Sequence, residues 1–185
     1  MNTKKKKIAI VTLVAAVVVL IIGLILRGKS TLPEFTGTAP EWNGIALGQD
    51  GEDKLKEVLG DPTHQAQVGE DRVRFEFDSP SHTRDSEALV ESGKVTFINR
   101  VVVIEEGITL DTIIEEYGQP ELTMYGEMSS FNYRLYAYPS KGIATEANDS
   151  ARDVLNIWYF TPKTTDDFIG FVEGRYYTSP QPHGF

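Results

Sequence analysis

The stretches LGDP at 59–62 and YGQP at 117–120 decide how this sequence folds. Each follows a run whose apolar residues recur at helical spacing, and in each a glycine and then a proline interrupt that run. Glycine adopts positive φ at a helix end without steric cost, and proline cannot continue a helix. The predicted helix-stop residues are Gly60 and Pro62 in the first stretch and Gly118 and Pro120 in the second.

The segments around the two stops follow the same order. Alternating apolar and polar residues at 72–78, after the first stop, are matched after the second stop by a strand-like segment at 131–138. The strand-like segment at 94–104 is matched in the same way by the one at 154–160. One helix on one small sheet buries too little apolar surface to be stable alone, whereas two such units can share a core. The sequence therefore predicts an α+β fold of two tandem helix-plus-antiparallel-sheet repeats, at 45–104 and 105–163.

An uncharged apolar segment occupies residues 8–26. As a helix it spans about 28 Å, which matches the hydrocarbon core of a bilayer. The tail at 1–7 contains four lysines, so the positive-inside rule places it in the cytoplasm and the rest of the chain outside the cell. A cleaved signal peptide is the alternative, but its apolar region is usually shorter, about 7–15 residues. We expect a transmembrane anchor at 8–26 and a spacer at 27–44.

The remaining segment, 164–185, begins with threonines that can cap a helix and continues with apolar residues at 168–172. It predicts a short helix and a tail, with a final edge strand as the alternative to the helix.

Charge and cysteine content narrow the function. All 27 acidic residues lie after residue 30, whereas six of the 18 basic residues precede it. Such an acidic domain is not expected to bind nucleic acid or an anionic lipid surface. The chain has no cysteine, so it has neither disulfides nor the cysteine that carries a bacterial lipid anchor. These features suit an extracytoplasmic domain at a bacterial surface.

The repeated unit resembles the SmpA/OmlA (BamE) family of small lipoproteins, and its duplication is similar to the tandem version of that fold in the β-lactamase inhibitor protein. The resemblance covers about 48–162 and implies a helix-on-sheet fold whose exposed sheet face or loops bind other proteins at the cell envelope. The family's lipid-bearing cysteine is missing here, and the predicted transmembrane helix replaces it. The residues that carry the resemblance are Gly48, Leu55, Val58, Leu59, Gly60 and Pro62, then Gly107, Ile113, Ile114, Tyr117, Gly118 and Pro120.

The sequence predicts no catalytic residue, metal ligand or cofactor. His64 follows a helix stop, His82 lies in a serine-rich loop, and His183 lies in the tail. These three histidines do not have the spacing of metal ligands. Adjacent acidic residues on a helix point apart, so they are interpreted as solvated side chains rather than a catalytic pair. We therefore expect no enzyme, with a hydrolase as a remote alternative.

The candidate partner-binding residues are Arg134, Tyr136 and Trp158, which strand alternation can place together on one exposed sheet face. Arginine, tyrosine and tryptophan are enriched at protein interfaces. The alternative is reversed alternation, in which Tyr136, Trp158 and Phe160 belong to the core, as large aromatic side chains mostly do.

Together these observations predict a single-pass protein of the cell membrane whose extracytoplasmic domain binds another protein of the bacterial envelope. Its expected partners are the lipid bilayer, through residues 8–26, and an envelope protein, but no nucleic acid. The alternative function is a sensor or carrier for a small ligand or cation, with a cleft between the two repeats.

Overall fold

The computed structural model describes residues 40–81 and 84–180. The predicted cytoplasmic tail at 1–7, the transmembrane segment at 8–26 and most of the spacer lie outside this range. Within the described part of the chain, no helix is both long and apolar enough to cross a bilayer.

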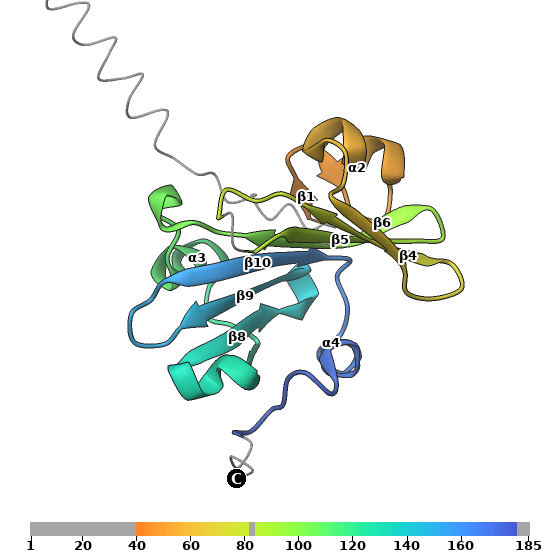
Figure 1. The fold of residues 1–185 in the computed structure, drawn as a ribbon. Coiled ribbons are helices and arrows are strands. Elements are labelled where there is room, and N and C mark those ends of the chain that lie inside the picture. The colour runs from red at the N-terminus through yellow and green to blue at the C-terminus, as the bar shows by residue number, and fades with distance from the viewer. Residues whose placement is uncertain (1–39, 82–83, 181–185) are drawn as a thin grey trace, which may run out of the picture. The chain divides into compact units, whose positions relative to one another are not determined.

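Three α-helices and a large antiparallel sheet make up the described residues (Figure 1). The helices are α2 (Glu52–Leu59), α3 (Leu110–Tyr117) and α4 (Thr165–Val172). The sheet has eight strands in the order β3-β4-β5-β6-β10-β9-β8-β7. Their bounds are β3 (His64–Gln67), β4 (Arg72–Phe77), β5 (Ser86–Glu91), β6 (Lys94–Val101), β7 (Leu122–Met124), β8 (Tyr133–Tyr138), β9 (Ile143–Asn148) and β10 (Val154–Phe160). The predicted combination of helices with an antiparallel sheet is confirmed.

The fold has two halves, and each half consists of one helix followed by four strands of the sheet. In the first half α2 precedes β3 to β6, and in the second half α3 precedes β7 to β10. The halves join at the centre of the sheet, where β6 and β10 pair with Ile98 opposite Tyr159. Shorter elements complete the fold: the paired strands β1 (Glu41–Trp42) and β2 (Ile45–Ala46), and the 3-10 helices η1 (Ile104–Glu106), η2 (Glu127–Phe131) and η3 (Pro139–Lys141).

The two helix ends have the same backbone geometry. Gly60 has φ +83° and ψ −168°, and Gly118 has φ +84° and ψ −167°. This region of backbone space is open essentially to glycine alone. The Gly60 N–H donates to the Lys56 carbonyl at 2.9 Å, and the Gly118 N–H donates to the Ile114 carbonyl at 2.8 Å. Both glycines thus satisfy a carbonyl of the last helical turn while the chain leaves for the sheet.

Threonine side chains begin the other two helices. The Thr109 hydroxyl accepts the Thr112 N–H at 3.3 Å at the start of α3. The Thr164 hydroxyl accepts the Asp167 N–H at 3.2 Å at the start of α4. Each bond satisfies one backbone donor that a helix leaves open at its N-terminus. The segment after residue 164 therefore forms the predicted short helix rather than an edge strand.

The sheet has two differently covered faces. On the face that we call the α2/α3 face, Leu55 from α2 and Ile113 from α3 pack in one buried cluster with sheet residues such as Phe75 and Tyr159. On the opposite face, the α4 face, Phe168 from α4 packs with the Phe160 ring at 5.0 Å between centroids. That second cluster also contains Phe97, Met124, Leu135, Ala137, Ala144, Trp158 and Val172.

Coverage of the α4 face is unequal along the sheet. In the first half, β5 alternates between buried and half-buried residues, as a strand with one wet face does. In the second half, residues 143–147 of β9 are all buried. The covered part of the α4 face therefore ends near the centre of the sheet, beside β6.

Candidate functional site

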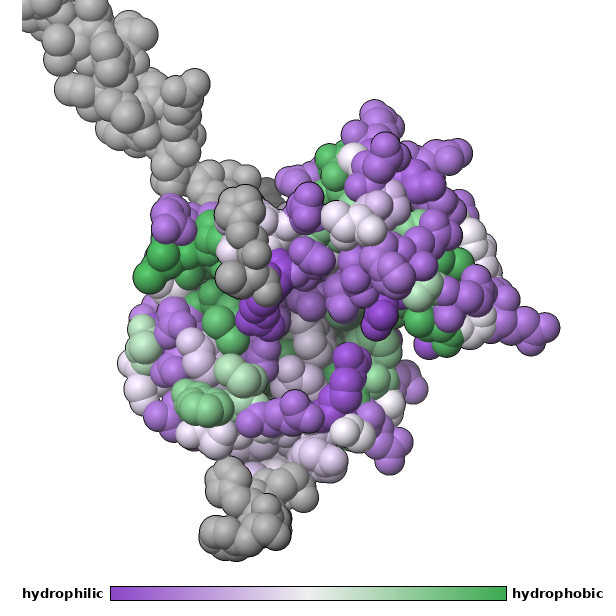
Figure 2. All heavy atoms as spheres, viewed as in Figure 1, coloured by the Kyte–Doolittle hydropathy of each residue, from purple (hydrophilic) through white to green (hydrophobic). Residues whose placement is uncertain are grey.

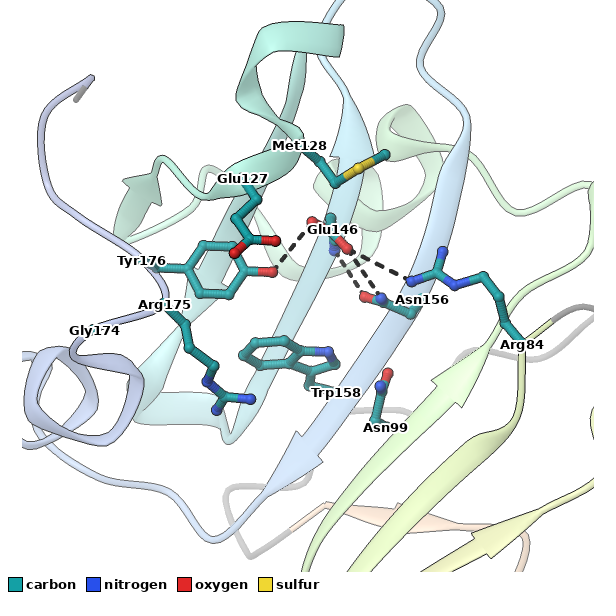
Figure 3. Close-up of a pocket in the computed structure, with 10 residues that line it drawn as sticks. All are labelled: Arg84, Asn99, Glu127, Met128, Glu146, Asn156, Trp158, Gly174, Arg175 and Tyr176. Atoms are coloured by element: carbon teal, nitrogen blue, oxygen red, sulfur yellow. Dashed lines mark hydrogen bonds and ion pairs between the residues drawn. The ribbon is translucent and has the colours of Figure 1, made fainter. Parts of the chain in front are cut away.

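A cavity of about 290 Å³ lies on the α4 face where this coverage ends (Figure 3). It is lined by residues of both halves and of the segment after α4. Asn99 comes from β6, Glu146 from β9, and Asn156 and Trp158 from β10. The other lining residues are Arg84, Glu127, Met128, Gly174, Arg175 and Tyr176.

Strand register brings the floor of the cavity together. Asn156 lies opposite Glu146 across β10 and β9, and Trp158 lies opposite Asn99 across β10 and β6. Cross-strand partners point to the same face, and so do residues two apart on one strand. The register alone therefore places these four side chains side by side on the α4 face.

Glu146 is the central charged group of the floor, and its side chain is almost fully buried. The Asn156 side-chain amide donates to one carboxylate oxygen at 3.2 Å, and the Tyr176 hydroxyl donates to the other at 3.1 Å. The Arg84 guanidinium lies 4.0 Å from the carboxylate. Burying a carboxylate is tolerable only with such compensation. Burial and the nearby Glu146 charge together raise the pKa of Tyr176, so this hydroxyl remains a donor.

Trp158 forms the aromatic part of the floor and is only 4% exposed. Its ring makes edge contacts with Phe97 and Tyr176, each at 5.6 Å between centroids. The Arg175 guanidinium lies over the same ring, 5.9 Å from its centre. Arg175 and Tyr176 thus close the side of the cavity nearest the C-terminus.

Two polar atoms of the floor lack a hydrogen-bond partner among the residues that the structure describes. They are the indole Nε1 of Trp158 and the side-chain oxygen of Asn99. Figure 3 shows the indole nitrogen on the side of the ring that faces Asn99. An unpaired buried polar group costs about 1–3 kcal/mol. Both residues line the cavity, but the two atoms themselves are buried beneath its wall.

Hydrogen bonds at two neighbouring residues hold the segment after α4 in place beside the cavity. The Tyr177 N–H donates to the Tyr125 carbonyl at 2.9 Å, and the Tyr125 N–H donates back at 2.8 Å. One residue earlier in the chain, the Tyr176 hydroxyl donates a hydrogen bond to the Glu146 carboxylate. We call residues 174–177 the strap. Its contacts to β9 and to residue 125 fix the position of Tyr176 over the floor.

The structure separates Trp158 from Arg134 and Tyr136, although the sequence suggested that the three residues form a shared surface. Tyr136 aligns through β9 with Ile157, the neighbour of Trp158, and neighbouring strand residues point to opposite faces. The expectation that Arg134, Tyr136 and Trp158 share one exposed face is therefore wrong. Tyr136 and Trp158 are both buried, which confirms the alternative that they belong to the core.

Arg134 and Tyr136 instead belong to a polar group at one end of β8. The Tyr136 hydroxyl donates to Asp149 at 2.8 Å, and the Arg134 guanidinium lies 3.3 Å from the same carboxylate. Arg134 also lies over the Tyr125 ring, 5.2 Å from its centre. Burial, followed by the bond to Asp149, raises the pKa of Tyr136. These contacts join β8 to the loop after β9 and leave Arg134 half-buried.

Of the residues that line the cavity, the sequence singled out only Trp158. Glu146 carried a signal, because it is an acidic residue inside the segment IATEA at 143–147, whose other residues are uncharged and mostly apolar. A charged side chain in a strand that is buried on both faces usually has ion-pair or hydrogen-bond partners. Asn99 carried no signal, since polar residues are common on a half-buried strand.

No group of three or more acidic or histidine side chains is placed to hold a metal ion within the described ranges. Among the histidines, His64 is exposed on β3, and His82 and His183 lie outside the described residues. A second cavity, of about 280 Å³, lies beside the half-buried ion pair of Arg100 and Glu106, with Trp42 and Phe77 in its wall.

Comparison with protein-family models gives no match, and comparison with curated proteins gives none either. Among solved structures, the chain is similar to a DUF4309 family protein, YjgB, from Bacillus subtilis. The TM-score is 0.48 at 10% identity, covering 69% of this chain and 89% of that one. It is also similar to an extracellular protein containing an SCP domain from Bacillus anthracis. Here the TM-score is 0.45 at 9% identity, covering 83% of this chain and 55% of that one. Such distant likenesses carry no argument about function.

Proposed function

We propose that this chain is a membrane-anchored, extracytoplasmic module of a bacterial envelope that binds a small polar ligand in the cavity around Glu146 and Trp158. The observation that carries the proposal is the cavity itself, which joins both halves and combines the buried Glu146 carboxylate and the Trp158 ring with the guanidiniums of Arg84 and Arg175. Few, well-placed polar groups in a concave site are the general mark of small-molecule binding.

The position of the cavity also supports this proposal. Its floor combines Asn99 of the first half with Glu146, Asn156 and Trp158 of the second. A cleft between two repeats is where the sequence placed the ligand of a sensor or carrier. This function, an alternative at the level of the sequence, therefore becomes our first proposal, with membrane attachment through residues 8–26 retained from the sequence pattern.

Tandem duplication and resemblance to the SmpA/OmlA family remain proposals about the fold. They are supported by the shared order of one helix and four strands in each half. The matching backbone of Gly60 and Gly118 supports them as well.

A protein partner is the second candidate function, and η2 favours it. This short helix carries Phe131, which is 67% exposed, and Met128, which is 38% exposed. Large exposed apolar side chains of this kind are enriched at interfaces. Because Met128 also borders the cavity, an envelope protein that docks on η2 would lie beside the bound ligand.

We propose a binding rather than a catalytic role. Two carboxyl groups, of Glu127 and Glu146, line the cavity, as a hydrolase would require. Both oxygens of Glu146, however, are engaged, one by Tyr176 and the other by Asn156 with Arg84 nearby. A carboxylate held in this way positions its neighbours and is poorly placed to act on a substrate.

The test is a ligand-observed NMR screen of the full chain against free amino acids, sugars, polyamines, nucleosides and short peptides. Met128→Trp places a bulky ring at the mouth of the cavity from an exposed position, so it should abolish ligand signals without unfolding the domain. Ile104→Trp is the matched control, because Ile104 is 84% exposed and does not line the cavity. Signals that survive Met128→Trp, or the absence of any signal from the whole panel, would contradict the proposal.

A further inference from the structure

The two edges of the eight-stranded sheet differ in what lies beside them. At the edge of the second half, the strap continues past β7, where Tyr125 and Tyr177 exchange two backbone hydrogen bonds of 2.8 and 2.9 Å. At the edge of the first half, no backbone hydrogen bond joins the outer side of β3 to another segment among the residues that the structure describes. β3 is therefore the edge that is open to a further strand.

The backbone groups on the outer side of β3 belong to Gln65 and Gln67. The Val68 N–H donates to the Arg72 carbonyl at 2.9 Å, so residue 68 turns its backbone groups toward the side of β4. In an antiparallel pair, the direction of these groups alternates from one residue to the next. Gln65 and Gln67 therefore turn their N–H and C=O groups away from β4, and both residues are exposed.

β3 lacks the features that usually protect the edge of a sheet. Edge strands commonly contain charged residues, a proline or a bulge, each of which hinders pairing with a further strand. The strand His64–Gln67 has no lysine, arginine, acidic residue or proline, and its pairing with β4 shows no register shift. Val68, directly after the strand, is a large apolar residue that is 46% exposed.

A second copy of β3 fits this edge in one antiparallel register. When Gln65 lies opposite Gln67 of the second copy, the outward N–H and C=O groups of both strands meet one another. A two-fold axis then passes between the two Ala66 residues, whose small side chains suit the close approach of a pair without hydrogen bonds. The same register sets the exposed Val68 opposite His64 of the second copy.

We propose that β3 is a self-association edge, through which two copies of this chain join their sheets about a two-fold axis at Ala66. Charge favours this strand over the rest of the surface, because the domain is strongly acidic while β3 carries no acidic residue. Stable interfaces bury more than about 1,000 Å², so pairing through one short strand forms a weak, reversible contact. Asp61 and Asp71 flank the strand, so salt strengthens the contact by screening their repulsion.

The experiment captures this contact with a disulfide, which is selective because the natural chain contains no cysteine. Ala66→Cys places two thiols across the axis, where the Cα atoms lie about 4.5 Å apart, within reach of a disulfide. Ile104→Cys is the control, because Ile104 is 84% exposed and lies in η1 rather than on β3. The full chain is oxidised in detergent, with many micelles for each protein molecule. Ala66→Cys should form dimers about tenfold faster than Ile104→Cys, and added salt should widen the difference.

Mixing two further variants tests the register. Gln65→Cys and Gln67→Cys lie opposite each other only in the proposed register, so they should form a mixed disulfide faster than either variant links to itself. Equal rates for all three combinations would contradict an ordered pairing of β3 with β3.

Gln65→Pro tests whether the backbone makes the contact. It removes an outward N–H and leaves the hydrogen bonds to β4 in place. Combined with Ala66→Cys, it should reduce dimer formation to the rate of Ile104→Cys, whereas Gln65→Thr should leave it within about twofold. Circular dichroism checks the fold. If Gln65→Pro does not fold, Gln65→Glu replaces it, because this change keeps the side-chain size, adds like charges to both edges and should slow dimer formation at low salt.

Two results overturn the proposal in solution: dimer formation by Ala66→Cys that is no faster than by Ile104→Cys, and a rate that the Gln65 variants leave unchanged. A third result concerns the occupant. If Ala66→Cys in intact membranes links to a different protein and not to a second copy, β3 remains a pairing edge, but the assignment of self-association is wrong.

Discussion

In the first half of the sheet, β5 alternates between buried and half-buried residues, whereas in the second half β10 buries all of its residues except Leu155. Both halves have the same order of elements and place their helix on the same face. They differ because α4 and the strap cover the other face of the second half, whereas in the first half this cover reaches only β6 and the part of β5 beside it. The candidate site lies at the border where this cover ends, so the asymmetry between similar halves creates the cavity.

The uncovered face of the first half is polar in a way that the second is not. Arg72 pairs with Glu91 at 2.6 Å, and Arg74 pairs with Glu76 at 3.2 Å. Figure 2 shows hydrophilic residues over most of the visible surface of α2, which packs on the other face of this half. Exposed ion pairs contribute little stability, but they keep a sheet face in water without inviting aggregation. The first half is thus adapted to remain open on one side, and the second half depends on its cover.

The largest effect is expected from Trp158→Ala in the covered half. Trp158 is buried between Phe97 and Tyr176, so truncation leaves a cavity beneath the strap. We expect the free energy of unfolding to fall by about 3–5 kcal/mol, measured by urea denaturation and circular dichroism.

Leu89→Ala is the matched change on the same face of the open half. Leu89 is half-buried beside the second cluster, so its truncation should cost about 1–2 kcal/mol. Equal losses for the two variants would show that cover by α4 does not distinguish the halves.

A loss of stability between those for Trp158→Ala and Leu89→Ala is expected from Gly142→Ala, in the turn between β8 and β9. Gly142 has φ +70°, and a Cβ there would lie 2.1 Å from the Phe160 carbonyl oxygen. The left-handed backbone costs about 1–2 kcal/mol for alanine, and the clash adds about 1–3 kcal/mol. Thermal unfolding measures the loss.

Gly93, in the turn between β5 and β6, provides the comparison in the first half. It has φ +76°, but a Cβ there would meet nothing within 4 Å. Gly93→Ala should therefore show the backbone cost alone, about 1–2 kcal/mol. A loss for Gly93→Ala as large as that for Gly142→Ala would contradict the close packing that we assign to the second half.

The sequence predicted the elements well because their signals are local. Gly60 and Gly118 mark helix ends by backbone chemistry, and strict alternation in RVRFEFD marks a strand with one wet face. In YRLYAY of β8 that alternation is lost, since Tyr136 and Tyr138 point to one face and Leu135 and Ala137 to the other. A strand that is apolar on both sides does not reveal which face a distant helix covers. The exposed position assigned to Tyr136 and Trp158 failed for this reason.

The candidate site was not predictable from local patterns. Asn99, Glu146 and Trp158 meet only through the pairing of β9, β10 and β6, which depends on how the two halves join. No spacing along the chain encodes that register. Trp158 was named for its residue type, and the structure assigns it a different role, as a buried floor with one free donor.

The smallest effect at neutral pH concerns the tyrosines, all eight of which follow residue 104. Burial raises the pKa of Tyr138 from 10.0 to about 12. Its hydroxyl donates to the Gly118 carbonyl at 2.9 Å, a bond worth about 1 kcal/mol. Tyr138→Phe should therefore lower the free energy of unfolding by about 1 kcal/mol at pH 7, where the phenol is neutral in both states.

The stability at alkaline pH tests the burial of Tyr138 in the second half. Between pH 10 and about 12 the unfolded chain releases the Tyr138 proton while the folded chain keeps it, so stability falls as pH rises. For one fully buried tyrosine, the free energy of unfolding falls by about 1.4 kcal/mol per pH unit in this window. Urea denaturation across this range should give a shallower fall for Tyr138→Phe than for the parent. Identical slopes would mean that Tyr138 ionises as readily in the folded chain as in the unfolded one.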